Sequence, residues 1–340
     1  MKRNLLVAVA LLCFLATPGE KRIKAASKID VSPYPSYAQM IDEIKQLAED
    51  HQHVSLATYG KSVEGRDLLV LKISKGKDKP AAWIGAVIHG NEWIGNRTAM
   101  NIAHMLAKQD TKLAEKTLDE MDFYIAPCQN PDGYYRTWQQ PCEDDNRPCR
   151  KNANGVDLNR NFPLPGKLTI PIDMAGSPEP DSIHYRGPEA LSEPETRAID
   201  RFFKEHPDIV AAISWHSYAA VMYPPHCETR TCLDRFQKAC KAYRRNQEHL
   251  PYPRLQTRVF DTYTGEMEDW LYHEYGVMAV DIEIGTRLLN MMDCKCDHLF
   301  WVFNPQEPQW WIENDSKAAL HYLLESDRIM EGKRIPPQER

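Results

Sequence analysis

Residues 81–92 read Ala-Ala-Trp-Ile-Gly-Ala-Val-Ile-His-Gly-Asn-Glu, an apolar run that ends abruptly in polar side chains. Seven of the first eight residues are apolar and the eighth is Gly85, which is typical of a central strand buried on both faces. His89 and Glu92 follow where this strand is expected to end. In open α/β folds the strand ends line the ligand site, so the pair predicts a site at one edge of a sheet.

Segments on either side of this stretch predict an α/β domain. Strands are expected at 68–73, 123–126, 209–214 and 277–283, and helices at 37–50, 96–108, 193–204, 233–245, 268–275 and 315–330. This alternation indicates one domain with a central mixed, twisted sheet flanked by helices. Residues 133–194 are rich in Pro, Gly, Asn and Asp, and a loop region of this length is expected to be functional.

Composition and charge narrow the class of protein. The chain has 340 residues, of which 42% are hydrophobic and 26% charged, as in ordinary globular proteins. A net charge of -6 without a basic tract argues against a nucleic-acid partner. Lys2 and Arg3 precede an apolar core at residues 5–16, which predicts a signal peptide over residues 1–27, cleaved between 16 and 27. The folded domain is then 28–340, located extracellularly or in a periplasm, and no other apolar run is long enough to span a membrane.

The cysteines fit an exported protein. Once Cys13 leaves with the signal peptide, eight remain, and an even number suggests disulfides. Short polar loops favour the local pairs Cys142/Cys149 and Cys227/Cys232, while the full connectivity stays open. A cysteine metal site is the competing interpretation, but the chain has no pair of Cys-x-x-Cys elements to support it.

Further polar side chains end other strands. His216 follows the strand at 209–214 as His89 follows the strand at 81–88. Two histidines and one glutamate with an open fourth position are typical of a catalytic zinc site, so His89, Glu92 and His216 are predicted to bind one Zn²⁺ per chain. Glu283 ends a third strand and is the candidate base for a zinc-activated water.

Several segments resemble, in order, the M14 family of zinc metallocarboxypeptidases (funnelins; carboxypeptidase A/B/T-like) over residues 34–330. The matching segments are Gly-Lys-Ser-Val-Glu-Gly-Arg at 60–66, His-Gly-Asn-Glu-Trp at 89–93, Asn-Pro-Asp-Gly at 130–133, Gly-Val-Asp-Leu-Asn-Arg-Asn-Phe at 155–162, Trp-His-Ser-Tyr at 215–218 and Asp-Ile-Glu at 281–283. The resemblance implies a hydrolase that removes the C-terminal residue of peptides, and with the predicted signal peptide we expect a secreted protein that acts as a monomer.

The resemblance also assigns roles. It makes His89, Glu92 and His216 the zinc ligands and Glu283 the general base, then the acid for the leaving amine. Arg150 would hold the carbonyl oxygen as it becomes an oxyanion, and Asn159 with Arg160 would bind the terminal carboxylate of the substrate. A guanidinium presents paired donors that match a carboxylate, which is the physical basis of the last role.

The chain departs from the family pattern in three places. The family's mobile tyrosine is matched by Tyr263 only if the loop is shorter, because strict spacing places Asp261 there. Asn91 stands where digestive members have an arginine. The short stretch between the signal peptide and the domain leaves no room for an activation segment, so no zymogen is expected.

Substrate preference rests on Glu268, which matches the base of the family's side-chain pocket. An acid there favours a basic C-terminal residue, or the ammonium end of diaminopimelate in cell-wall peptides. Alternatively, Glu268 and Asp269 only begin a helix, where the helix dipole favours acids. Two other functions stay open, an amidohydrolase with the same His-x-x-Glu…His core that acts on acylated amino acids or cell-wall peptides, and a non-catalytic binding protein on the same fold.

Overall fold

The computed structural model describes residues 29–76, 79–141, 147–164, 176–227, 229–255, 265–285 and 298–340. The predicted signal peptide lies outside the described residues, and so do Asp261 and Tyr263. The proposed division of the chain at residue 27 therefore stays a prediction.

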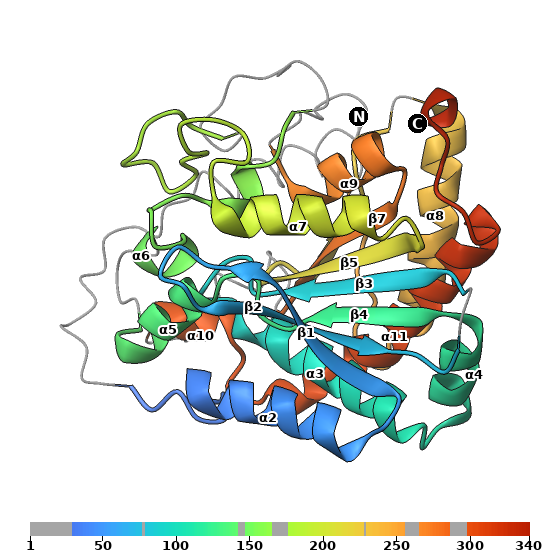
Figure 1. The fold of residues 1–340 in the computed structure, drawn as a ribbon, viewed down its shortest axis with the longest axis horizontal. Coiled ribbons are helices and arrows are strands. Elements are labelled where there is room, and N and C mark those ends of the chain that lie inside the picture. Colours follow the sequence, from blue (N-terminus) through green and yellow to red (C-terminus); the bar gives the residue numbers. More distant parts are fainter. Residues whose placement is uncertain are drawn as a thin grey trace.

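A seven-stranded sheet forms the centre of the described part of the chain (Figure 1). In sequence order the strands are β1 (Val54–Lys61), β2 (Asp67–Ile73), β3 (Ala81–Ala86), β4 (Asp122–Ala126), β5 (Ile209–Ser217), β6 (Val221–Tyr223) and β7 (Met278–Ile284). In space their order is β1-β2-β4-β3-β5-β7-β6. The pairs β4/β3, β3/β5 and β5/β7 are parallel, and the outer pairs are antiparallel, so the predicted mixed sheet is confirmed.

Strand β3 contributes to two apolar cores, one on each face of the sheet, because its side chains alternate between the faces. Trp83 packs with Phe202 and Phe203 on one face, whereas Ala82 and Ile84 belong to the larger core on the other. All six residues of β3 are buried, as expected for a strand covered on both sides.

Helices cover both faces of the sheet (Figure 1). Helices α7 (Pro194–Glu205) and α9 (Met267–Tyr275) contribute to the core around Trp83, and they lie above the sheet in Figure 1. The other core includes Tyr272 of α9 and takes its remaining helical residues from a larger group: α2 (Tyr37–Asp50), α3 (Trp93–Lys108), α4 (Lys112–Glu120), α5 (Pro131–Gln139), α8 (Arg230–Arg245), α10 (Leu299–Phe303) and α11 (Pro308–Met330). Three shorter elements are α6 (Arg147–Arg150), η1 (Leu158–Arg160) and η4 (Pro337–Glu339).

The predicted helices all occur, and all except α2 begin at a different residue from the predicted one. Helix α2 has the expected bounds because Ser36 accepts a hydrogen bond from the Gln39 backbone N–H while the Gln39 side chain caps Ser36 in return. Helices α3 and α11 begin earlier than predicted, at Trp93 and Pro308. Strands β1 and β6 were not predicted, because one has an irregular burial pattern and the other has only three residues.

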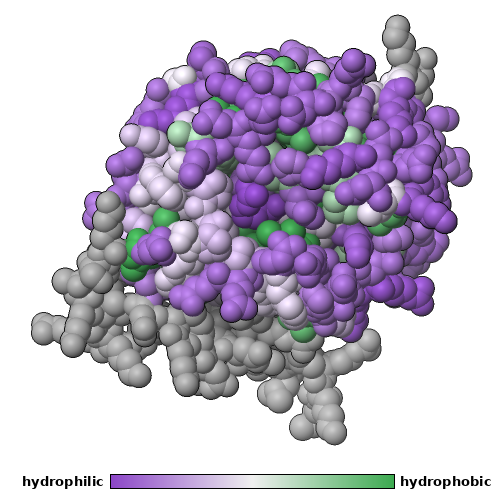
Figure 2. All heavy atoms as spheres, turned by 90° about the horizontal axis from the view of Figure 1, so that it is seen from below, coloured by the Kyte–Doolittle hydropathy of each residue, from purple (hydrophilic) through white to green (hydrophobic). Residues whose placement is uncertain are grey.

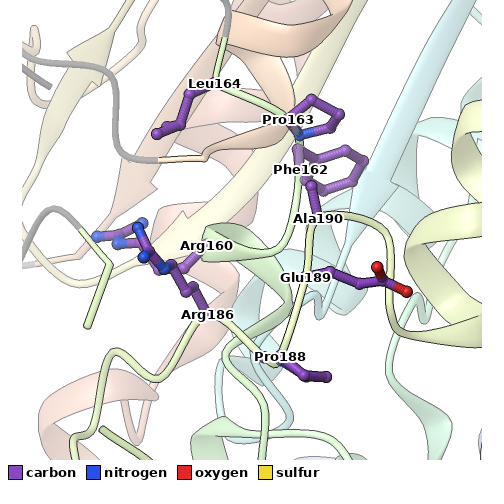
Figure 3. A pocket seen from close by; sticks show the side chains of 9 residues that line it. Arg160, Phe162, Pro163, Leu164, Arg186, Pro188, Glu189 and Ala190 are labelled. Carbon is purple, nitrogen blue, oxygen red and sulfur yellow. The ribbon is translucent and has the colours of Figure 1, made fainter. Parts of the chain in front are cut away.

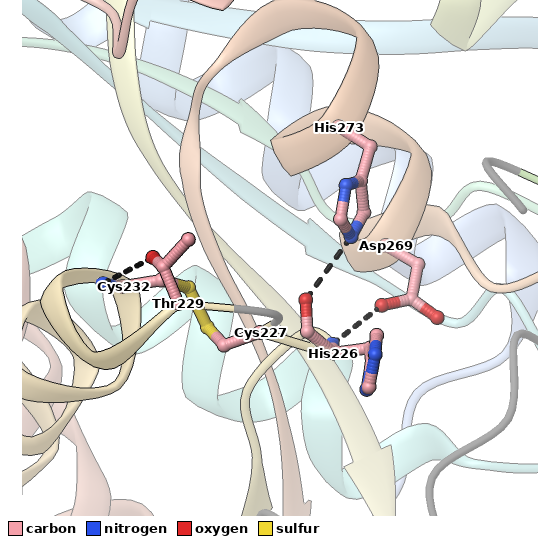
Figure 4. The surroundings of a disulfide bond; sticks show 6 residues. All are labelled: His226, Cys227, Thr229, Cys232, Asp269 and His273. Atoms are coloured by element: carbon pink, nitrogen blue, oxygen red, sulfur yellow. Dashed lines mark hydrogen bonds between the residues drawn. A yellow bond between two sulfur atoms is a disulfide. The ribbon is translucent and has the colours of Figure 1, made fainter. Parts of the chain in front are cut away.

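The structure supports the local disulfide predictions where it describes them. Cys227 and Cys232 are bonded, next to the start of α8, where Thr229 accepts a hydrogen bond from the Cys232 backbone N–H (Figure 4). Cys149 is also disulfide-bonded, but its predicted partner Cys142 lies outside the residues whose contacts are described. Cys128 and Cys240 are buried free thiols.

On the face seen in Figure 2, most of the described residues are hydrophilic, and the hydrophobic ones form small separate groups. Among the described residues, no helix combines the length and the apolar character needed to cross a membrane.

Candidate active site

The three predicted metal ligands meet at the carboxyl ends of β3 and β5. These strands are parallel, with Ala86 opposite Trp215, so the residues that follow Ala86 lie beside His216. Strand β3 ends at Ala86, before the predicted end at 88, because Val87 takes a left-handed conformation with φ of 55°. Such a conformation is strained for a β-branched residue and occurs here two positions before His89.

The donor atoms of His89, Glu92 and His216 lie within 4.8 Å of one another. The Nδ1 atoms of the two histidines are 3.2 Å apart. One Glu92 carboxylate oxygen is 3.0 Å from His89 Nδ1, and the other is 3.1 Å from His216 Nδ1. All three side chains are buried.

The opposite nitrogen of each imidazole has its own partner. His89 Nε2 is 3.2 Å from a carboxylate oxygen of Asp157, and His216 Nε2 lies 2.9 Å from Ser214 Oγ and 3.3 Å from Asp281 Oδ2. These partners favour a proton on Nε2, so in the neutral form of each ring Nδ1 is the nitrogen available to a cation.

This donor set fits a zinc ion. Two imidazole nitrogens and a carboxylate are ligands that Zn²⁺ prefers, and each histidine has the outer hydrogen-bond partner usual for a metal ligand. Burial disfavours a charged His216, but Asp281, Glu92 and Glu283 outweigh it and raise its pKa to about 10. The same negative charges favour a metal cation between the ligands.

Asn304 holds the loop that carries Glu92. Its side chain accepts from the Trp93 and Ile94 N–H groups at the start of α3 and donates to the Asn91 carbonyl. A Cβ on Gly90 would lie 2.4 Å from the backbone of Gly133, so only glycine fits there.

Glu283 lies on β7 directly beside His216, because the parallel pairing of β5 and β7 places the two residues opposite each other. Its Oε2 atom is buried and has no hydrogen-bond partner among the described residues. Burial raises its pKa to about 8, with a further contribution from the charge of Glu92. A carboxylate that takes up a proton near neutral pH is suited to act as a general base.

Arg150 is the last residue of α6, and its side chain lies close to Glu92. Its Nε donates to Asp157 Oδ2 at 2.9 Å, and its Nη1 lies 3.7 Å from Glu92 Oε1. Its backbone carbonyl accepts from the Gly90 N–H, which ties α6 to the His89 loop. Burial opposes ionisation of Asp157, but the charges of Arg150 and His89 outweigh it and hold the Asp157 pKa well below its usual range.

Asn159 and Arg160 lie in η1, the short helix that Asp157 caps. The Asn159 amide donates to Asp281 Oδ2 at 3.2 Å, and its oxygen accepts from the Met267 N–H. Arg160 Nη1 donates to Glu266 Oε1 at 2.9 Å and to the Asn159 carbonyl. Asn159 is thus joined to His216 through Asp281, and both predicted carboxylate-binding residues already have partners within the protein.

Glu268 lies in the first turn of α9, which agrees with both interpretations of this residue. However, it is only 2% exposed, and within the described part of the chain its Oε2 atom has no hydrogen-bond partner. Burial raises its pKa well above the usual range, and the charges of Asp281 and Glu266 add to this. A favourable helix dipole does not account for a buried carboxyl oxygen without a partner.

Sequence reasoning missed the roles of several residues that position this site. Asp157 and Ser214 hold the ligand imidazoles, Asn304 holds the Glu92 loop, and Glu266 pairs with Arg160. Ser214 was open to prediction, since it lies two residues before His216 and so on the same face of the strand. Asn304 gave no such signal, because it lies far along the chain from Glu92.

Comparisons with known proteins agree with this geometry. A model of the zinc carboxypeptidase family (Peptidase_M14) matches residues 40–295. The chain is 33% identical to carboxypeptidase A2 of Rattus norvegicus over 234 residues, which cover 62% of this chain and 53% of that protein. It is 30% identical to carboxypeptidase A1 of Bos taurus over 277 residues, which cover 75% of this chain and 63% of that protein. The matches thus span less than two thirds of the length of these relatives.

Solved structures show the same fold. Bovine thrombin-activatable fibrinolysis inhibitor, in complex with tick carboxypeptidase inhibitor, superposes with a TM-score of 0.70 at 25% identity, over 88% of this chain and 98% of that one. Carboxypeptidase A from Helicoverpa armigera superposes with a TM-score of 0.67 at 21% identity, over 95% of this chain and 81% of that one. The family match covers most of the chain and includes the converging His-Glu-His group, and the chain belongs to the zinc carboxypeptidase family.

Proposed function

We propose that this protein is a secreted, zinc-dependent metallocarboxypeptidase that hydrolyses the C-terminal peptide bond of peptides. The observation that carries the proposal is the convergence of His89, Glu92 and His216 beside Glu283, whose Oε2 atom is buried. We also propose that the protein is exported through residues 1–27 and acts as a monomer with one Zn²⁺ bound by the three ligands.

In the proposed mechanism, each of these residues has a separate role in hydrolysis. When bound, zinc supplies a Lewis acid that polarises the scissile carbonyl and lowers the pKa of water. Glu283 accepts a proton from the attacking water and returns it to the departing nitrogen. Arg150, oriented by Asp157, donates to the carbonyl oxygen as negative charge develops there. Asn159 and Arg160 hold the terminal carboxylate, which restricts cleavage to the last peptide bond.

The test is release of single C-terminal residues by the purified protein, followed by mass spectrometry on a panel of peptides. Hydrolysis is expected to stop with a zinc chelator and to return when zinc is added back. The panel includes peptides ending in lysine, arginine, leucine and diaminopimelate, which separates the wall-peptide alternative. No zinc-dependent release from any peptide would reject the proposal.

We further propose a preference for basic C-terminal residues, supported by the buried carboxyl of Glu268. Glu266 and Asp269 carry ligand-type oxygens within 4.8 Å of those of Glu268. Acids this close together repel one another when ionised, and a substrate ammonium or guanidinium would relieve that repulsion.

Glu268→Gln tests this preference. We expect kcat/KM for peptides ending in lysine or arginine to fall about 10- to 100-fold, as for a lost charge-assisted contact, with leucine peptides changing by about 2-fold or less. Glu274→Gln is the matched control, because Glu274 is exposed near the end of the same helix. An equal loss for basic and apolar peptides would show that Glu268 supports the fold rather than the preference.

A further inference from the structure

A cavity lies beside Arg160 (Figure 3). Its volume is about 320 Å³, and it lies between the segment at 158–164 and the turn at 186–190. Phe162, Pro163, Leu164 and Pro188 supply much of its apolar lining. Its cations are Arg160 and Arg186, whose guanidinium groups extend to the same side in Figure 3. The space is sufficient for a single residue of a peptide.

Backbone contacts fix the shape of this cavity. The Asn161 amide donates to the carbonyls of Arg186 and Glu189, at 2.8 and 3.0 Å, which joins its two walls. Gly187 has φ of +83°, and a Cβ at this position would lie 2.5 Å from Ser192 Oγ, so the turn requires glycine. The backbone at Arg186 is therefore fixed by the hydrogen bond to its carbonyl and by the turn at Gly187.

The two residues expected to bind a terminal carboxylate are already engaged by the protein. Arg160 Nη1 donates to Glu266 and to the Asn159 carbonyl, and both ends of the Asn159 amide have partners. Glu266 carries negative charge next to the position that an incoming carboxylate would take. A substrate carboxylate would thus need another cation to offset this repulsion.

Arg186 is such a cation. Within the described part of the chain, its guanidinium has neither a hydrogen-bond acceptor nor an ion-pair partner, and it is half-buried. Among the described residues that line the cavity, Glu189 is the only acid, and its carboxylate points away from both arginines in Figure 3. A guanidinium in partly apolar surroundings binds a carboxylate more strongly than one in open water.

We propose that Arg186 binds the terminal carboxylate of the substrate together with Arg160, and so determines the affinity for substrates with a free C-terminus. The inference rests on the proposed carboxypeptidase function. In this arrangement Arg186 draws the carboxylate towards Arg160 while Glu266 remains paired, and hydrolysis itself does not depend on it.

Kinetics of the zinc-loaded full chain test this role. For an acylated dipeptide with a free C-terminus, Arg186→Gln is expected to raise KM about 10-fold with kcat changed about 2-fold or less, because a charge-assisted bond is lost from substrate binding. Arg186→Lys should restore part of the affinity, since it returns the charge without the planar fork. Arg244→Gln, an exposed arginine in the last turn of α8, is the charge-matched control and should match the wild type.

Binding without turnover separates this inference from the proposed function. Calorimetry with 3-phenylpropanoate and with its amide measures what the carboxylate contributes. We expect Arg186→Gln to weaken the carboxylate about 10-fold and to leave the amide unchanged. Equal carboxylate affinity in the wild type and in Arg186→Gln would overturn the inference. A wild type that binds the carboxylate through Arg186 but releases no residue would instead overturn the proposed function.

Discussion

His89 and His216 illustrate how single residues prepare the site. Each presents Nδ1 to the ligand cluster while its Nε2 is held, in one case by Asp157 and in the other by Ser214 and Asp281. Because one nitrogen is fixed by the protein, the other is ready to bind a cation without rearrangement. The residues that set these tautomers are thus as much part of the site as the ligands themselves.

Replacement of Glu283 by glutamine tests the proposed base. Glu283→Gln keeps the shape of the side chain but cannot accept a proton, so we expect kcat to fall about 10²- to 10⁴-fold. Zinc content, measured by atomic absorption, should stay at one ion per chain, because Glu283 is not among the proposed ligands. Activity close to that of the wild type would show that another group acts as the base.

The proposed ligands could be predicted from the sequence, and so could Ser214 beside His216, but Asp157 and Asn304 could not. His89, Glu92 and His216 follow strand-like apolar runs, and this local signal is enough to place them at one edge of a sheet. The contact between Asp157 and His89 joins residues from different loops, and no local pattern encodes it. The positions proposed for the family tyrosine, Tyr263 and Asp261, lie outside the described residues and stay predictions.

At the scale of elements, the start of helix α7 is a buried acidic junction. Asn152 donates to the carboxylates of both Glu193 and Glu195, and the Val63 N–H also donates to Glu195. Burial raises the pKa of Glu195 to about 7, although these hydrogen bonds partly oppose the shift. The junction joins α7 to the loop region that carries Arg150 and to the turn before β2.

This junction predicts a pH dependence of stability. The folded pKa of Glu195 is raised above the 4.5 of the free side chain, so folding favours the protonated form. Its contribution to stability is complete below about pH 4.5 and is lost as the pH rises through about 7. From about pH 5 to pH 8, the free energy of unfolding should therefore fall by about 2 kcal/mol more in the wild type than in Glu195→Gln.

Urea denaturation at both pH values measures this difference. Glu205→Gln provides the control, because Glu205 is exposed at the other end of the same helix. The same loss of stability with pH in all three proteins would mean that Glu195 titrates as an ordinary carboxyl.

Helices were easier to predict than strands in this chain. Helix α2 has a clear capping box and an apolar stripe through Met40, Ile44 and Leu47. Strand β1 mixes exposed and buried residues without strict alternation, because its pairing with β2 shifts register between Thr58 and Gly60. A register shift of this kind disrupts the two-residue period on which strand prediction depends.

At the scale of the whole molecule, the C-terminal segment joins several elements. Arg334 donates to the carbonyls of Phe203, His206 and Ile209, at the end of α7 and the start of β5. The Ile335 N–H donates to the Gly276 carbonyl after α9. These bonds link the last residues to the layer of helices above the sheet.

Arg334→Met removes these three donor contacts and keeps a side chain of similar length. We expect the free energy of unfolding to fall by about 2–3 kcal/mol, because the carbonyls lose charge-assisted partners. Arg328→Met on α11 is the control and should change stability by about 0.5 kcal/mol or less, since the ion pairs of Arg328 with Glu120 and Glu325 are exposed to solvent. Thermal unfolding of both variants gives the comparison, and equal melting temperatures would exclude this role for Arg334.

The pairing of His216 with Glu283 across β5 and β7 has a consequence for how such proteins diverge. A proposed metal ligand and the proposed base are neighbours in one backbone ladder, whereas Arg160 ends the short helix η1, Arg186 lies in a turn and Glu268 lies at the start of α9. Insertions and substitutions in those outer segments can accumulate over generations without moving the ladder. Descendants of one ancestral chain can then change the peptides they trim while they inherit the same hydrolytic step.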